Sequence, residues 1–446
     1  MSARLPRQPL PWRDPWQVVC ALAIHFGAEG LVWLDGDGSP LGRWGRLGVA
    51  PQRTVCCRGL GSAAGGSDPF AALQALEQDL RQAPGSWMGW LAYEAGSWVE
   101  PAAHWKPPAM AVLWAARFGF ELVFDQLQQQ LWLEGEGPGE AIASLLTAAE
   151  APLPAPAPTG VAPSAWQWHT DRRRFAEQVQ QIRDWIASGD LFQANLTACC
   201  EAVLPSADEA LALSLYGRLR RHCPAPFSGL AIGSDGARGE AVLCSSPERF
   251  LRVDATGLVE TRPIKGTRPR SADRDTDGAA AAELVSSPKD RAENVMIVDL
   301  LRNDLGRVCV PGSIHVPQLV GLESYPQVHH LTSVIEGQLR PGVGVAELLR
   351  ACWPGGSITG APKIRACQRL AQLEPVARGP YCGSLFRLGS DGSFDSNILI
   401  RSLMLNNGSL RAHAGCGIVA DSDPDAEADE MGWKIQPLLD ALAPTP

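Results

Sequence analysis

Short apolar runs separated by glycine-rich turns make up much of the first third of the chain, and this pattern is typical of β-strands. The runs cover residues 31–34, 120–124 and 130–133. Helical spacing of apolar residues follows an Asp68-Pro69 start and continues to residue 83, and a second helix is predicted from 139 to about 149. We therefore expect residues 1–150 to form a β-rich segment that contains two helices.

A proline-dense stretch follows, with five prolines between positions 151 and 163. Proline fixes φ and removes a backbone donor, so this stretch suits neither a helix nor a central strand. We place a connector at residues 151–165, and it separates the N-terminal segment from a second segment, residues 166–446.

The second segment mixes predicted helices with predicted strands. Its first helix is expected to begin with Thr170 as the cap and to end at Gly189. Further helices are predicted at 207–221, 288–306, 344–352 and 362–373, and from Pro424 onward, with Pro437 ending or kinking the last one. Strands are predicted at 192–197, 228–233, 241–245, 383–388, 396–405 and 410–414, and Lys265 is expected on a loop. Because strands and helices do not alternate strictly, we predict an α+β fold.

Charge and cysteine usage narrow the class of protein. The formal net charge is -9 and the isoelectric point is near 5.5, which argues against a nucleic-acid partner. An acidic protein that binds an anion has to supply the attraction locally, through a few cations or a metal ion. The twelve cysteines show no Cys-x-x-Cys spacing, and no run of about eighteen apolar residues occurs. We expect a cytoplasmic protein that does not interact with membranes.

Carboxylates at helical spacing are the first candidates for chemistry. Glu427, Glu430 and Lys434 share one face of the C-terminal helix, and Glu293 lies in the first turns of the helix that begins at Pro288. Two such carboxylates suit a hard divalent cation such as Mg²⁺. A solvated acidic first turn, favoured by the helix dipole, is the alternative that the residues alone leave open.

A further carboxylate, Glu248, follows an apolar strand, where a strand-end loop commonly positions an acid or base. Arg249 is a candidate partner for it. The glycine-rich runs 355–363 and 415–417 have neither phosphate-loop nor dinucleotide-binding spacing, so we expect their backbone N–H groups to face a carboxylate instead.

Several long motifs in order resemble those of the chorismate-utilising enzymes, and the similarity covers nearly the whole chain. The motifs are Ser246-Pro-Glu-Arg-Phe250, Pro263-Ile-Lys-Gly-Thr267, Ala292-Glu-Asn-Val-Met-Ile-Val-Asp-Leu-Leu-Arg-Asn-Asp304, His330-Leu-Thr-Ser333, Pro354-Gly-Gly-Ser-Ile-Thr-Gly-Ala-Pro-Lys363 and Gly417-Ile-Val-Ala-Asp-Ser-Asp-Pro424. The resemblance is strongest to the branch that forms aminodeoxychorismate, and it implies a two-layered β-sandwich core flanked by helices.

The resemblance also implies roles for individual residues. It implies that Glu293 and Glu430, with Glu427 nearby, hold Mg²⁺ against the ring carboxylate of chorismate. It implies substrate contacts from a larger set of residues: Gln193, Gly266, Thr267, His330, Thr359, Tyr381, Arg401, Gly415, Cys416, Gly417 and Lys434.

Two positions choose among the reactions of the family. Where similar enzymes that use water carry a general-base lysine, this chain has Gln193, which cannot take a proton at neutral pH. Where anthranilate synthases typically have alanine, this chain has Lys265. The resulting hypothesis is that Lys265 attacks ring C2 of chorismate, that ammonia then adds at C4, and that Glu248 transfers protons. The expected product is 4-amino-4-deoxychorismate, a precursor of 4-aminobenzoate and folate.

The expected partner is a separate glutaminase subunit, because no Gly-x-Cys-x-Gly turn that would supply ammonia from glutamine is present. In relatives the N-terminal half often holds tryptophan; Pro226, Phe227 and Ser228 match that pocket, whereas Gly36 replaces a usual serine. Tryptophan binding therefore stays open. The alternatives are an anthranilate synthase component and a non-catalytic chorismate or tryptophan sensor.

Overall fold

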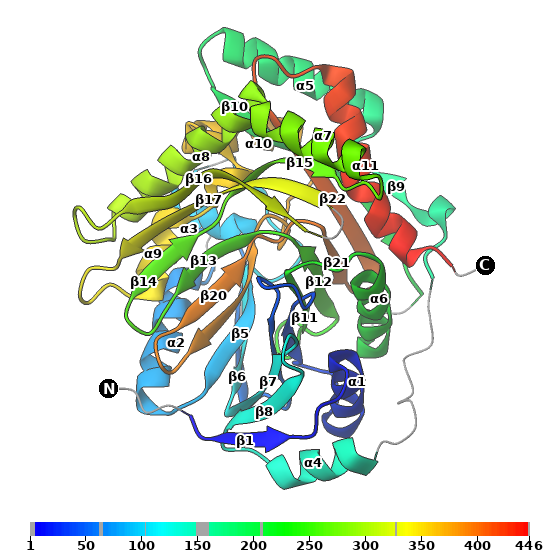
Figure 1. Cartoon of the computed structure of the whole chain (residues 1–446), viewed down its shortest axis with the longest axis vertical. Helices are drawn as coiled ribbons and strands as arrows, with labels where there is room; N and C mark the ends of the chain where they lie inside the picture. The colour runs from blue at the N-terminus through cyan, green and yellow to red at the C-terminus, as the bar shows by residue number, and fades with distance from the viewer. Residues whose placement is uncertain are drawn as a thin grey trace.

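Two antiparallel sheets lie face to face and helices cover their outer sides (Figure 1). The computed structural model describes residues 5–61, 66–102, 104–148, 160–205, 208–325 and 328–444. The α+β class and the two-layered sandwich expected from the sequence are confirmed. In the described ranges, no helix combines the length and the apolar character needed to cross a bilayer.

The larger sheet takes strands from both ends of the chain. Its spatial order is β1 (Arg7–Leu10), β8 (Gln130–Gly135), β7 (Phe120–Asp125), β3 (Trp44–Gly48), β2 (Val32–Asp35), β11 (Phe227–Ile232), β12 (Glu240–Ser246), β21 (Ser402–Asn406), β22 (Ser409–Ile418), β10 (Gln193–Val203) and β18 (Gly360–Ala361), with β9 (Gln167–Trp168) beside β10.

The smaller sheet is built in the same way from distant segments. Its order is β15 (Ile264–Pro269), β17 (Val328–Gln338), β14 (Leu258–Thr261), β13 (Arg249–Val253), β20 (Phe394–Asn397), β19 (Ser384–Gly389), β5 (Ser86–Leu91), β6 (Leu113–Phe118) and β4 (Arg53–Cys57), with β16 (His315–Ser324) beside β17.

The helices of the described residues connect strands of the two sheets, except the last helix, which follows the final strand. They are α1 (Pro15–Phe26), α2 (Pro69–Gln82), α3 (Gly96–Val99), α4 (Gly139–Ala148), α5 (Arg172–Ala187), α6 (Glu209–His222), α7 (Arg274–Ser286), α8 (Pro288–Gly306), α9 (Val345–Cys352), α10 (Lys363–Leu373) and α11 (Pro424–Leu442), with single 3₁₀ turns at Tyr93–Ala95, Pro163–Ala165 and Gly356–Ile358. Helix α11, red in Figure 1, packs on α5, α6 and β22.

Successive side chains of the central strands in the larger sheet contribute alternately to two separate hydrophobic cores. In β2, Val32 faces the core between the sheets, whereas its neighbour Trp33 faces the core under the outer helices. Val242 and Leu243 of β12 divide in the same way. Successive side chains of a strand point to opposite faces, so a central strand covered on both sides is apolar throughout. The larger sheet is thereby fixed from both faces, and it forms a rigid base for the residues along β10 and β22.

The predicted helices and strands are present with shifts of a few residues, and five predictions need correction, of which the strand 396–405 is described in the next paragraph. Lys265 lies in strand β15 and not on a loop. Asp171, not Thr170, caps α5, because its carboxylate accepts the N–H of Arg174. Helix α11 continues through Pro437 to Leu442. Arg249 pairs with Asp395 and Glu260 and not with Glu248.

The predicted strand 396–405 is two strands in different sheets. β20 ends at Asn397 in the smaller sheet, and β21 begins at Ser402 in the larger one. Arg401, in the crossing between them, has a φ of 52°. Apolar periodicity continues through this crossing because Ile398 and Leu399 are buried in the core between the sheets, so the sequence pattern gave no sign of the break.

The proposed segment boundary stays a prediction. Residues 151–159 of the connector lie outside the described residues. Strands from residues 1–150 pair with strands from the second segment in both sheets: β2 pairs with β11, and β5 pairs with β19.

Candidate active site

Lys265 reaches the site because of an irregularity in its strand. The register between β15 and β17 shifts between Lys265 and Thr267, and Gly266 between them has a φ of 81°. A Cβ atom at position 266 would lie 2.8 Å from a Leu284 side-chain carbon, so glycine suits both the backbone conformation and the space. On the other side of the shift, Thr267 Oγ1 hydrogen-bonds His330 Nδ1 at 2.8 Å.

His330 is held as a neutral imidazole. Burial is the main cause that lowers the pKa of His330, to about 4, and the positive charge of Arg401 lowers it further. The ring therefore hydrogen-bonds as an uncharged group at neutral pH.

Glu293 connects two of the predicted site residues. Its Oε1 accepts a hydrogen bond from Lys265 Nζ at 2.7 Å and another from Gln193 Nε2 at 2.5 Å. The other side-chain atom of Gln193, Oε1, is buried and has no hydrogen-bond partner among the described residues. Gln193 is the first residue of β10 and pairs with Ala361 of β18, the outermost strand at this end of the larger sheet.

Gly417 closes this group from a fourth element. A Cβ atom there would lie 2.3 Å from Glu293 Oε1, 2.5 Å from Gln193 Nε2 and 3.3 Å from Lys265 Nζ. Strands β10 and β22 pair Asn195 with Gly417, whereas the pairing of β22 with β21 ends at Ala412. Residues 415–417 are thus part of strand β22. One edge of the strand pairs with β10 there, whereas the other edge is not paired with β21 beyond Ala412.

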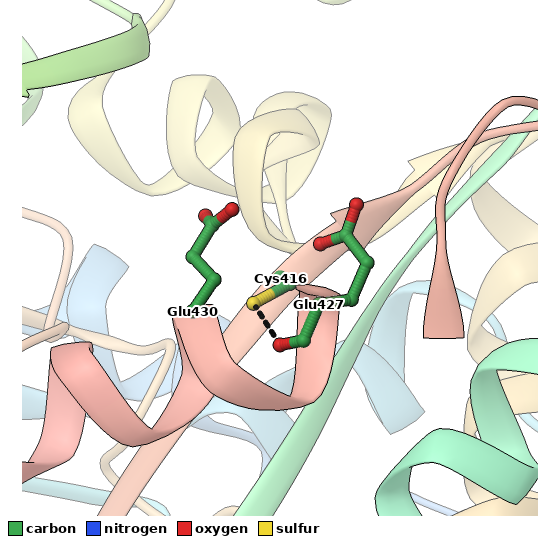
Figure 2. A group of neighbouring side chains, drawn as sticks. All are labelled: Cys416, Glu427 and Glu430. Carbon is green, nitrogen blue, oxygen red and sulfur yellow. Dashed lines mark hydrogen bonds between the residues drawn. The ribbon is translucent and has the colours of Figure 1, made fainter. Parts of the chain in front are cut away.

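The two carboxylates of α11 lie beside this group. Figure 2 shows Glu427 and Glu430 extending from one turn of the helix toward the same side, with Cys416 behind them. One potential ligand atom from each of the three residues lies within 4.8 Å of the others. Burial raises the pKa of the Cys416 thiol to about 12, and the thiol donates to the backbone oxygen of Glu427 at 3.4 Å. The donors that this group offers a cation are therefore carboxylate oxygens.

Each of the three carboxylates has a lysine partner. Lys265 lies 2.7 Å from Glu293, Lys289 lies 3.0 Å from Glu427, and Lys434 lies 2.6 Å from Glu430. Lys434 also donates to the backbone oxygen of Gly415 at 3.1 Å. Burial opposes charge on Lys289, but Glu427, Glu293 and Glu430, in that order, outweigh it and raise its pKa. Lys289 therefore lies within the field of all three carboxylates.

Glu248, two residues after the end of β12, is within the electrostatic influence of Lys265. Its side chain is buried at the end of β12, and burial raises its pKa to about 7, against the opposing effects of a hydrogen bond from Ser357 and the charge of Lys265. A carboxyl group with such a pKa is able both to donate and to accept a proton near neutrality.

Arg401 provides a cation without a matching anion. Among the described residues its guanidinium group makes no ion pair or hydrogen bond, although Tyr381 and Glu430 act on it electrostatically. Burial lowers its pKa. Tyr381 is itself buried and stacks on His413, with ring centroids 4.7 Å apart. A half-buried guanidinium with no carboxylate partner is suited to an anionic ligand.

Thr359 is a predicted substrate contact, but its side-chain hydroxyl forms hydrogen bonds within its own turn. Its hydroxyl donates to the backbone oxygens of Gly355 and Gly356, at 3.0 and 3.4 Å. Its backbone oxygen accepts from Asn195 of β10, which fixes the glycine-rich turn against the larger sheet.

Pro226, Phe227 and Ser228 line a separate hollow between the ends of the two sheets. Its other walls come from residues of both sheets: Leu34, Asp35, Leu41, Trp44, Arg249, Leu385, Asp395, Ser396 and Asn397. Gly36 is nearby in sequence, and a Cβ atom there would lie 2.0 Å from the backbone oxygen of Gly42. This backbone therefore leaves no room for the serine that is usual in relatives.

Three residues of the site were not predicted from the sequence: Lys289, Ser357 and Ser422, the last of which donates to Glu427 at 2.7 Å. Ser357 and Ser422 each lie inside a motif quoted above, and Lys289 lies three residues before another, so their positions were visible although their contacts were not. The rarity of lysine was the clearest sequence feature that could have indicated Lys289 as a site residue, because the chain has only five lysines among 39 basic residues.

Comparisons with known proteins agree on one family. A family model described as chorismate binding enzyme matches residues 43–440. Aminodeoxychorismate synthase component 1 of Salmonella typhimurium is 46% identical over 279 residues, which make up 63% of this chain and 60% of that protein. Anthranilate synthase component 1 of Streptomyces coelicolor is 34% identical over 406 residues, covering 84% of this chain and 78% of that one.

A solved structure supports the same fold. Anthranilate synthase component I from Streptococcus pneumoniae superposes with a TM-score of 0.74 at 26% identity, and the match covers 89% of this chain and 92% of the other. The aminodeoxychorismate synthase relative, by contrast, is matched over only 60% of its own length.

Proposed function

The chain belongs to the family of chorismate binding enzymes, and from that premise we propose that it converts chorismate and ammonia to 4-amino-4-deoxychorismate. The observation that carries the proposal is the position of Lys265, whose amine lies 2.7 Å from Glu293 and which acts electrostatically on Glu248. A primary amine between an acid–base group and a carboxylate cluster suits covalent catalysis.

Chorismate is a dianion, and the site offers cations for both of its carboxylates. Arg401 and Lys434 are suited to the enolpyruvyl carboxylate, because the guanidinium of Arg401 has no anionic partner among the described residues. The ring carboxylate is assigned to the side where Glu293, Glu427 and Glu430 lie, where a bound metal ion would supply the positive charge. This arrangement supplies the local positive charge that an acidic protein needs for an anionic substrate.

A magnesium ion fits this donor set. The donors are carboxylate oxygens, and the neighbouring Cys416 thiol stays protonated, so the set favours a hard cation over a soft one. When bound there, Mg²⁺ would neutralise the ring carboxylate and fix its orientation. Glu293, Glu427 and Glu430 are the proposed ligands.

In the first chemical step the neutral amine of Lys265 attacks ring C2. The N–C2 bond forms, both ring double bonds shift by one position, and the C4–O bond breaks. Glu248 donates the proton with which the hydroxyl leaves as water. In the second step ammonia attacks C4, the double bonds return, and the C2–N bond breaks so that its electron pair returns to Lys265. The new C4 ammonium then gives its surplus proton to Glu248.

Gln193 accounts for the choice of ammonia over water. Its amide cannot deprotonate a water molecule, whereas ammonia attacks without a base. A glutaminase subunit is the proposed source of ammonia, and the name "component 1" of the relatives indicates that those proteins have a further component.

We further propose tryptophan as the ligand of the hollow that Pro226, Phe227 and Ser228 line. Apolar walls and the oppositely charged Arg249 and Asp395 suit an aromatic amino acid that carries both charges.

One product assay tests the proposed reaction. The purified chain is incubated with chorismate, Mg²⁺ and ammonium, and the products are separated and weighed by mass spectrometry. Aminodeoxychorismate supports the proposal. Anthranilate with pyruvate would instead establish an anthranilate synthase, and no turnover would favour a sensor.

A further inference from the structure

Lysine is rare in this chain and is concentrated at one place. Five of the 39 basic residues are lysines, and the remaining 34 are arginines. Three of the five, Lys265, Lys289 and Lys434, each pair with one of the three clustered carboxylates. An ammonium group is a compact point charge, so it resembles a bound cation more closely than the planar guanidinium group of arginine does.

Two of these lysines already have a proposed role and the third has none. Lys265 is the proposed nucleophile and Lys434 a proposed substrate contact. Lys289, at the start of α8, is 46% exposed, yet its ammonium group lies 3.0 Å from a carboxylate that is only 4% exposed. The same oxygen of Glu427 also accepts the hydroxyl of Ser422, at 2.7 Å. Two donors therefore occupy one of the two carboxylate oxygens of Glu427.

We infer that Lys289 is a tethered counter-cation of the metal-free site: its ammonium group holds Glu427 and competes with a divalent cation for the three carboxylates. Its ammonium group lies 3.0 Å from Glu427, and Glu293 and Glu430 also act on it electrostatically. A divalent ion that enters has to displace Lys289 or share Glu427 with it. The exposed stem of Lys289 allows the side chain to move into solvent, so displacement needs no change of fold.

This inference rests on the proposed metal site but not on the identity of the product. It predicts that Lys289 weakens metal binding and stabilises the protein without metal. Lys289 would thus keep the buried Glu427 paired until substrate and metal arrive, since an unpaired buried carboxylate is costly.

The test is the affinity for Mg²⁺ alone, measured by isothermal titration calorimetry without chorismate. In Lys289→Met, which keeps the apolar stem, the Kd for Mg²⁺ should fall about two- to five-fold, the range expected for a partly exposed ion pair. Lys289→Arg, which keeps the charge, should bind Mg²⁺ no more tightly than the wild type. Arg291→Met is the matched control: it removes one positive charge from an exposed position two residues further along α8 and should leave the Kd nearly unchanged.

Thermal unfolding supplies a second measurement. With EDTA present, Lys289→Met should melt below the wild type, and saturating Mg²⁺ should reduce that difference. A Kd for Lys289→Met equal to or weaker than that of the wild type would overturn the inference, as would an equal effect of Arg291→Met. Absence of Mg²⁺ binding by both the wild type and Lys289→Met would also overturn it. The product assay above, which measures turnover, fails or succeeds independently of these results.

Discussion

The amine of Lys265 and the carboxylate of Glu293 form an ion pair with a separation of 2.7 Å, so the proposed nucleophile is bound to a proposed metal ligand. A metal ion bound to Glu293 would interact with the carboxylate that now forms the ion pair with Lys265. Binding of a metal ion and release of the amine would thereby be coupled through one carboxylate oxygen, which also accepts a hydrogen bond from Gln193.

The first prediction separates a covalent role of Lys265 from an electrostatic one. Lys265→Ala and Lys265→Arg should both lose formation of aminodeoxychorismate from ammonium by at least about 100-fold, because neither side chain provides a neutral amine. The measurement is the initial rate of product formation. If Lys265→Arg kept most of the rate, the positive charge and not the nucleophile would be the contribution of this residue.

Mass spectrometry of the intact protein checks the same step directly. With chorismate and Mg²⁺ but no ammonia, the wild type should gain the mass of chorismate less one water, and Lys265→Ala should not. Lys363→Arg is a suitable control, because Lys363 pairs with Asp304 outside the carboxylate cluster.

The second prediction concerns the close approach of β22 to the site. Gly417→Ala would place a methyl group 2.3 Å from Glu293 Oε1 and 2.5 Å from Gln193 Nε2. Either side chain has to move, so turnover and Mg²⁺ affinity should each fall by about ten-fold or more while the fold persists. Rates, calorimetry and circular dichroism together measure this.

Gly432→Ala provides the matched control on α11. Nothing lies within 4 Å of a Cβ atom at position 432, so this substitution should leave activity unchanged and raise the stability of the helix slightly. Wild-type kinetics in Gly417→Ala would show that the side chains around Gly417 adjust freely.

The third prediction is a pH dependence of stability caused by Glu248. Burial raises its pKa from 4.5 to about 7, so between these values the folded protein keeps a proton that the unfolded chain loses. The free energy of unfolding therefore decreases as pH rises through this window, by up to about 3 kcal/mol from this group. Glu248→Gln should remove that contribution.

The difference in unfolding free energy between Glu248→Gln and wild type, from urea titrations at pH 4.5 to 8, measures the effect. Glu94, whose pKa burial raises to about 8, contributes equally to both proteins and cancels in the difference. Parallel stability curves for the two proteins would contradict the assigned pKa of Glu248.

The fourth prediction concerns the hollow between the sheets. Calorimetric titration with L-tryptophan should give measurable heat and a higher melting temperature, and Phe227→Ala should abolish both, because the ring of Phe227 forms an apolar wall. Leu322→Ala, on the exposed face of β16, serves as a control. No heat and no thermal shift with the wild type would exclude a tryptophan site.

Most elements could be predicted from sequence because their periodicity is strong. The α2 stripe that includes Phe70 and Leu73, and the long helix from Pro288, lie close to where apolar spacing and capping residues placed them. What the sequence could not reveal was pairing over long distances. No local pattern indicates that residues 396–405 cross from one sheet to the other, or that β10 and β22 lie side by side.

The candidate site shows the same limit. Spacing on one helix brought Glu427 and Glu430 together, and the family motifs indicated Glu293 and Lys265. The partner of each carboxylate depends on side chains that meet from different elements, and Lys289 was therefore missed. Contacts of this kind follow from tertiary structure and not from residue type or period.

The crossing at residues 398–401 joins the two places where ligands are proposed. Asn397 lines the tryptophan hollow and donates to the backbone oxygen of Phe227 at 2.8 Å, and Arg401 lies four residues further on beside Tyr381 and Glu430. A ligand that shifts Asn397 would act on a short segment of chain whose other end carries Arg401, the proposed substrate contact. Binding at one of the two proposed sites would then affect the other through a displacement of residues 398–401 alone, without relative motion of the two sheets.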